Sequence, residues 1–143
     1  MSSDAGSDEA LYHELMYYTL AHPSPTFIHQ HAVDAYAAQH ATETSKPITD
    51  VFAVIGLYLY LEKDFTGKQV QKAHMQMAKH RKHWPKLALP SERGSVVIAD
   101  VLAAPAGAER DRMIRQWCVA VWSAWSASRA QIAALARDEL GVA

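Results

Sequence analysis

The sequence predicts a single-domain, all-α helical bundle with about five main helices and one short helix. Apolar residues recur at the three- and four-residue spacing of a helix face, and breaks containing proline or glycine separate the segments. No segment long enough to build a sheet alternates with the two-residue period of a half-buried strand. The length of 143 residues suits one domain, and 50% apolar with 20% charged residues is typical of a globular protein.

The domain is expected over residues 9–143, after a flexible polar tail over residues 1–8. Proline lacks an N–H group and disfavours the helical conformation in the preceding residue, so Pro23, Pro47 and Pro105 mark breaks between helices. The predicted helices span about residues 9–22, 26–41, 49–62, 66–84, 97–103 and 108–140. The side chains expected to cap the first four are those of Asp8, Thr26, Thr49 and Thr66.

The third predicted helix contains the longest apolar run of the chain, VFAVIGLYLYL (residues 51–61). A helix that is apolar on every side is surrounded by other helices, so we expect this one at the centre of the bundle. The run is too short to cross a bilayer, which needs about 20 residues. We therefore expect no membrane span, and the acidic, polar N-terminus does not resemble a secretory signal.

The last predicted helix carries a regular core stripe that includes Trp117, Cys118 and Trp125. Trp122, at the edge of this stripe, and Trp125 are candidates for the rim of a pocket or an interface; alternatively, Trp122 only covers the end of the bundle. The single cysteine permits no internal disulfide and no thiolate-rich zinc site, which favours a reducing cytoplasm. Without a neighbouring base, Cys118 is expected to be an inert buried thiol.

The second predicted helix carries the most informative polar residues, in HQHAVDAYAAQH (residues 29–40). At about 100° per residue, His29, Tyr36 and His40 share one arc with apolar residues, and Gln39 lies inside that arc. These four side chains are therefore expected to point into the bundle. An inward-facing imidazole can act as a metal ligand or a proton carrier.

Two carboxylates complete the candidate site. Asp34 is expected nearer the rim of the arc, and Glu62 ends the central helix, where burial would raise its pKa. The candidate ligand- or metal-binding residues are His29, Asp34, Tyr36, Gln39, His40 and Glu62. A divalent metal is compatible with this set but not required, and His29 and His40, about 16 Å apart along the helix, cannot share one ion. The alternative is that the histidines are structural and bond to backbone carbonyls.

Four motifs together resemble an uncharacterised bacterial family, catalogued only as a domain of unknown function. They are HQxxVDAYAxQH (residues 29–40), GLYLxxEK (residues 56–63), ADVLAA (residues 99–104) and WxxxVWxxW (residues 117–125). The resemblance spans about residues 11–135 and implies a compact helical fold, but it names no activity. Many members begin with a Cys-rich, zinc-ribbon-like segment that is not found here, so no function of that segment is carried over.

Charge is distributed unevenly along the chain. Residues 1–62 have a net charge of −7 and residues 63–93 of +6, while the whole chain has −1. The fourth predicted helix presents a lysine stripe beside Met75, opposite an apolar face; the stripe consists of Lys68, Lys72, Lys79 and Lys82. Such a stripe can hold an acidic partner or a second copy of the chain, although a solvated helix face is the alternative. A pI near 6.7 does not favour nucleic acid as the partner.

The sequence leaves two functions open. The favoured one is a small-molecule- or divalent-metal-binding helical domain with a core pocket lined by His, Tyr and Glu; whether it is an enzyme is left open. The alternative is a protein-interaction module that uses the basic fourth helix, with purely structural histidines. The chain contains no Gly-rich phosphate loop, no nucleophile elbow and no EF-hand pattern.

Overall fold

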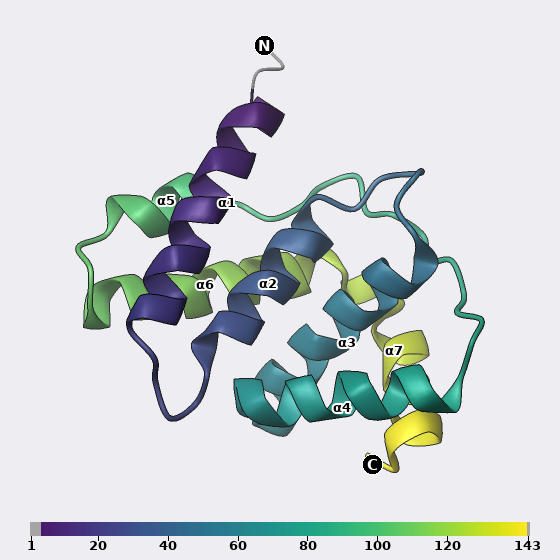
Figure 1. The fold of residues 1–143 in the computed structure, drawn as a ribbon. Helices are drawn as coiled ribbons and strands as arrows, with labels where there is room; N and C mark the ends of the chain where they lie inside the picture. Colours follow the sequence, from purple (N-terminus) through teal and green to yellow (C-terminus); the bar gives the residue numbers. More distant parts are fainter. Residues whose placement is uncertain (1–3, 143) are drawn as a thin grey trace.

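The computed structural model describes residues 4–142 and shows a single all-α domain (Figure 1). Its elements are α1 (Asp4–Ala21), α2 (Ile28–Gln39), α3 (Pro47–Lys63), α4 (Gly67–His80), α5 (Ile98–Ala103), α6 (Ala108–Ala124), the 3₁₀ helix η1 (Ser126–Ser128) and α7 (Arg129–Leu140). The described residues contain no strand, and none of their helices is long and apolar enough to cross a membrane. The predicted fold class is confirmed.

Helix α3 lies at the centre of the bundle, as its all-round apolar surface predicts. It packs against α2, α4, α6 and α7 (Figure 1), and residues 51–59 are all buried except the half-buried Phe52. Helix α2 lies beside it and packs against α1, α3, α4 and α6. More than one face of α2 is therefore covered, which decides where its polar side chains lie.

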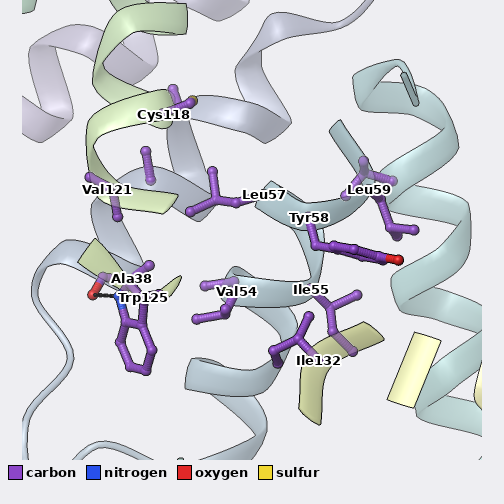
Figure 2. Close-up of a cluster of buried hydrophobic side chains, with 14 of the residues drawn as sticks. Ala38, Val54, Ile55, Leu57, Tyr58, Leu59, Cys118, Val121, Trp125 and Ile132 are labelled. Atoms are coloured by element: carbon purple, nitrogen blue, oxygen red, sulfur yellow. Dashed lines mark hydrogen bonds between the residues drawn. The ribbon is translucent and has the colours of Figure 1, made fainter. Parts of the chain in front are cut away.

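The hydrophobic core includes the region where α3 meets α6 and α7 (Figure 2). Val54 and Leu57 of α3 lie toward Val121 of α6 and toward Trp125, which directly follows α6, and all four are buried. The Trp125 indole Nε1 donates a hydrogen bond to the carbonyl oxygen of Ala38 at 3.2 Å, so its buried N–H has a partner. The expected core position of Trp125 is confirmed.

Helix α4 has the cap that the sequence predicts. Thr66 Oγ1 accepts a hydrogen bond from the Gln69 backbone N–H at 3.2 Å, and Gln69 Oε1 accepts one from the Thr66 N–H at 2.8 Å. This reciprocal capping box satisfies two N–H groups that the helix leaves free at its start. The helix ends at His80, earlier than expected, because Arg81 is already extended with φ −146° and ψ 140°.

The other three predicted caps are wrong. Asp8 lies inside α1, which takes in part of the segment expected as a tail; residues 1–3 of that segment lie outside the described residues. Helix α2 follows Phe27, in the left-handed conformation with φ 57°, so Thr26 is not its cap. Helix α3 begins two residues before Thr49, at a proline, whose missing N–H needs no partner in the first turn.

The prediction of one long last helix is also wrong, because η1 divides this segment into α6 and α7. The Trp125 N–H donates to the Trp122 carbonyl at 3.0 Å and the Ser128 N–H to the Trp125 carbonyl at 2.9 Å, which is the tighter 3₁₀ pattern. Serines at 126 and 128 favour such a break, since their hydroxyls compete for backbone hydrogen bonds. The break allows α7 to pack against α3 and α4.

Candidate functional site

Three of the predicted site residues lie at the seam between α1 and α2. His29 Nδ1 is 2.8 Å from Thr19 Oγ1, and His40 Nε2 is 3.0 Å from Asp8 Oδ2. The Tyr36 ring stacks on the His40 ring, with 4.1 Å between centroids. All three side chains are half-buried rather than fully inward, and each contacts another side chain of the protein.

Gln39 does point inward, as predicted, and is 8% exposed. Its Nε2 donates hydrogen bonds to the carbonyl oxygens of Arg93 at 3.1 Å and Val96 at 2.8 Å. Its Oε1 accepts one from Trp117 Nε1 at 2.9 Å. The amide thus ties α2 to α6 and to the connection before α5, and it has little capacity left for a ligand.

Glu62 lies away from the other candidates, at the C-terminal end of α3. Its carboxylate accepts hydrogen bonds from Trp122 Nε1 at 2.8 Å and from the Arg129 guanidinium, with Nε at 2.9 Å. The hydrogen bonds from Arg129 lower the pKa of Glu62, opposing the smaller effect of burial. The expected raised pKa is therefore wrong, and half-buried Trp122, at the edge of the core as predicted, bonds to this carboxylate.

Asp34 is buried, not near the rim. It is 3% exposed, and its carboxyl group lies in a notch opposite Gly56 of α3, where a Cβ would come within 1.9 Å of Asp34 Oδ2. Gln30 Nε2 donates a hydrogen bond to Asp34 Oδ1 at 3.1 Å, whereas Oδ2 has no hydrogen-bond partner. Burial raises the pKa of Asp34 well above its ordinary value, which favours the neutral acid.

Asp34 lines a groove of about 340 Å³ between α2, the first half of α3, and α4. The lining residues are Gln30, Val33, Asp34, Ala37, Ile48, Thr49, Phe52, Ala53 and His74. His74 Nε2 pairs with the carbonyl oxygen of Phe52 at 2.8 Å, and the two rings stack with 5.1 Å between centroids. The groove therefore combines apolar walls with a carboxyl, an amide and an imidazole, the mixture typical of small-molecule sites.

His31, on the same side of α2 as Asp34, was missed as a candidate. It is 2% exposed, and neither ring nitrogen has a hydrogen-bond partner. Its ring stacks on that of Tyr60, with 3.5 Å between centroids, beside a hollow of about 190 Å³. Burial, assisted by the nearby positive charge of Arg115, lowers its pKa to about 4.

The reason for the wrong placement of Asp34 and the neglect of His31 is the number of helices around α2. A helix wheel distinguishes an apolar face from a polar one, and the polar face was assigned to solvent. Helix α2 packs against four other helices, so its second face is covered as well. The sequence signal was the i, i+3 pair of His31 and Asp34 on that face.

The metal-binding prediction gains no support from the positions of the candidate ligands. Among the described side chains, those of residues 8–142, no three of His, Cys, Asp or Glu gather closely enough to hold an ion. Cys118 is fully buried, and burial raises the pKa of its thiol, as an inert role requires. Its setting in a reducing cytoplasm stays a prediction.

The predicted lysine stripe is exposed along α4, but Lys82 lies beyond the end of the helix. Lys68 Nζ lies over the Phe27 ring, 4.3 Å from its centroid. Lys72 and Lys79 flank Met75, which is 58% exposed, beside a hollow of about 380 Å³. The expected face therefore consists of three lysines on the helix and one in the following connection.

The fold and the groove define a single-domain, all-α protein with a partly enclosed, mainly apolar groove between three helices. Residues 5–126 match the sequence model of the "Family of unknown function (DUF5946)", and the chain belongs to this family. Membership of an uncharacterised family is thus confirmed, while the bacterial origin stays a prediction. Comparisons with curated proteins and with solved structures find no match.

Proposed function

We propose that the chain binds a small molecule in the groove between α2, α3 and α4, with Asp34 as its anchor. One observation carries the proposal: the buried Asp34 carboxyl lines this groove, and its Oδ2 has no partner. Leaving a buried polar group unpaired costs about 1–3 kcal/mol, which a ligand that supplies the partner would offset. The groove volume of about 340 Å³ suits a small organic molecule.

The proposal keeps the function favoured by the sequence but changes its site. Of the six predicted ligand residues, only Asp34 lines the groove; Gln30 and His74 are new members. An organic ligand fits these groups better than a divalent metal, because a metal needs several ligands directed at one point.

The proposal can be tested by two-dimensional NMR of the ¹⁵N-labelled full chain with a set of small organic fragments. Saturable shifts are expected at the backbone amides of Val33, Ala37 and Ala53. Ala37→Phe, which fills the groove, should remove these shifts, while Ala130→Phe at an exposed position of α7 should not. Fragments that leave the groove amides unshifted, or that still bind Ala37→Phe, would contradict the proposal.

A second candidate function is self-association through α4, and a specific charge relationship favours it. Helix α4 has three lysines and no acid, whereas α1 has exposed Glu9 and Glu14 and no Lys or Arg. Both helices also expose large apolar side chains. On α1, Tyr17 is 75% and Leu20 is 58% exposed, and on α4, Met75 is 58% exposed. We propose that α1 of a second copy docks on this face of α4. The partner of the lysine stripe is then a protein surface and not a nucleic acid.

Charge reversal tests this docking by analytical ultracentrifugation. Lys72→Glu with Lys79→Glu should abolish association, and adding Glu9→Lys with Glu14→Lys should restore it, because the complementarity is then inverted. The matched control reverses two exposed cations elsewhere, Lys46→Glu with Arg112→Glu. A monomeric wild type, or association unaffected by the α4 variant, would contradict docking between copies.

A further inference from the structure

We infer that the ligand of the groove is a small organic amine in its cationic form, whose ammonium group takes the place of the Gln30 amide beside Asp34. The inference rests on the proposed function and narrows it to one chemical class of ligand. Three properties of the groove support it: the sign of charge it can carry, the hydrogen-bond donor it lacks, and the chemistry of its walls.

The groove can carry negative charge only. Asp34 is its single acid, and no lysine or arginine lines it. His74 is neutral: its Nε2 donates to the Phe52 carbonyl, which leaves Nδ1 as an acceptor, and burial lowers its pKa. Tyr12 of α1 and Cys118 of α6, whose pKa values are raised by burial and by the charge of Asp34, are not cations either.

The carboxyl of Asp34 lacks a donor that an ammonium group can supply. Gln30 Nε2 bonds to Oδ1, and Oδ2 is covered and unpaired beside Gly56. An ammonium group has three N–H donors in a compact head, so it can bond to both oxygens where the Gln30 amide serves one. Its positive charge also favours the ionised carboxylate, which opposes the effect of burial on Asp34 when the amine is bound. Gln30 is itself half-buried at the groove, and its side chain must turn away when the ammonium enters.

The walls of the groove suit the rest of an amine. Phe52 lines the groove, and its ring is held by the stacked His74 ring and by a T-shaped contact with Trp84, whose centroid is 5.2 Å away. Attraction between a cation and an aromatic ring increases when water is excluded. Apolar lining comes from Val33, Ala37, Ile48 and Ala53, which can contact a hydrocarbon body.

The experiment compares benzylamine with benzyl alcohol, which has the same shape but no charge, by NMR titration of the full chain at neutral pH. The affinity for benzylamine should be at least about tenfold higher than that for benzyl alcohol, because a charge-assisted hydrogen bond is stronger than a neutral one. Asp34→Asn should remove this preference. Asp50→Asn should retain it, because Asp50 is an equally buried acid of α3 that is paired with Ser45 and lies outside the groove.

Gln30→Ala gives a second readout that does not require the Asp34 variant to fold. Removing the competing amide should strengthen benzylamine binding and leave benzyl alcohol binding nearly unchanged. Equal affinity for the two probes in the wild type overturns the amine inference while leaving the proposed function intact. Absence of saturable shifts with benzylamine also overturns it, and the fragment set with Ala37→Phe then decides the proposed function separately.

Discussion

The carboxyl group of Asp34 occupies the space that a side chain at Gly56 would need: a Cβ at residue 56 would lie 1.9 Å from Asp34 Oδ2 and 2.6 Å from its Cγ. This contact joins α2 to the central helix α3 beside the groove that Asp34 lines. The glycine in the middle of α3, which costs about 1 kcal/mol of helix stability relative to alanine, thus makes room for a buried acid.

Gly56→Ala should therefore destabilise the protein, despite the better helix propensity of alanine. We expect a loss of about 1–3 kcal/mol in the free energy of unfolding, typical of an overpacked core, measured by urea denaturation. Asp34→Ala removes the clashing group, so the double variant should be more stable than the sum of the two single effects. Additive effects would show that the two residues are not in contact.

The stability of the protein should fall as pH decreases from about 6.5 toward 4, partly because of His31. The folded state binds the proton of His31 less tightly than the unfolded chain, since the pKa falls from 6.5 to about 4. The contribution of His31 to the free energy of unfolding is fully present above its unfolded pKa of 6.5 and is lost as pH falls toward 4. It amounts to roughly 3 kcal/mol at most. Urea unfolding across this range should show a shallower dependence for His31→Phe, which keeps the ring stack on Tyr60. Gln116→Ala, an exposed substitution that changes no titratable group, should leave the slope unchanged.

Asp34 should have the opposite effect on the pH dependence. Its pKa is raised in the folded state, so its contribution is fully present below the unfolded value near 3.8 and is lost as pH rises through the raised value. Asp34→Asn should gain stability relative to the wild type as pH increases, because the asparagine has no buried carboxyl group to ionise. Parallel stability curves would contradict this, and exposed Asp138→Asn serves as the control.

Gln39→Ala should be strongly destabilising. The substitution removes three hydrogen bonds and leaves the buried Trp117 indole N–H without a partner. We expect a loss of about 2–4 kcal/mol, since each unsatisfied buried group costs about 1–3 kcal/mol. Gln76→Ala, which removes one exposed hydrogen bond to Glu139, should cost far less in the same thermal and urea measurements.

The local chemistry of the chain predicted some of the features that depend on neighbours in sequence, although of the four expected caps only Thr66 is confirmed. The capping box of Thr66 and Gln69 begins α4, and the apolar run of α3 lies at the centre. A cap or an apolar run acts within one helix, so its effect is visible in the sequence. The cap position of α2 is held by Phe27 in the left-handed conformation, whereas polar residues are usually preferred there. Local cap preferences therefore did not predict where α2 begins.

The candidate site depended on contacts between helices and was predicted only in part. Asp34 was a candidate, but its burial follows from Gly56, twenty-two residues later in the chain. His74 was not among the candidates, and its partner is the Phe52 carbonyl of α3. No spacing within α2 reveals these distant partners.

The sequence by itself determined an all-helical chain, its apolar central helix and the inward position of Gln39, because periodic spacing and side-chain type suffice for those features. Only the tertiary structure decided that α2 is covered on two faces, which moves the site from the seam with α1 to the groove at Asp34. The physical reason is that burial depends on how many helices surround a face, and that number is set by the packing of segments distant along the chain.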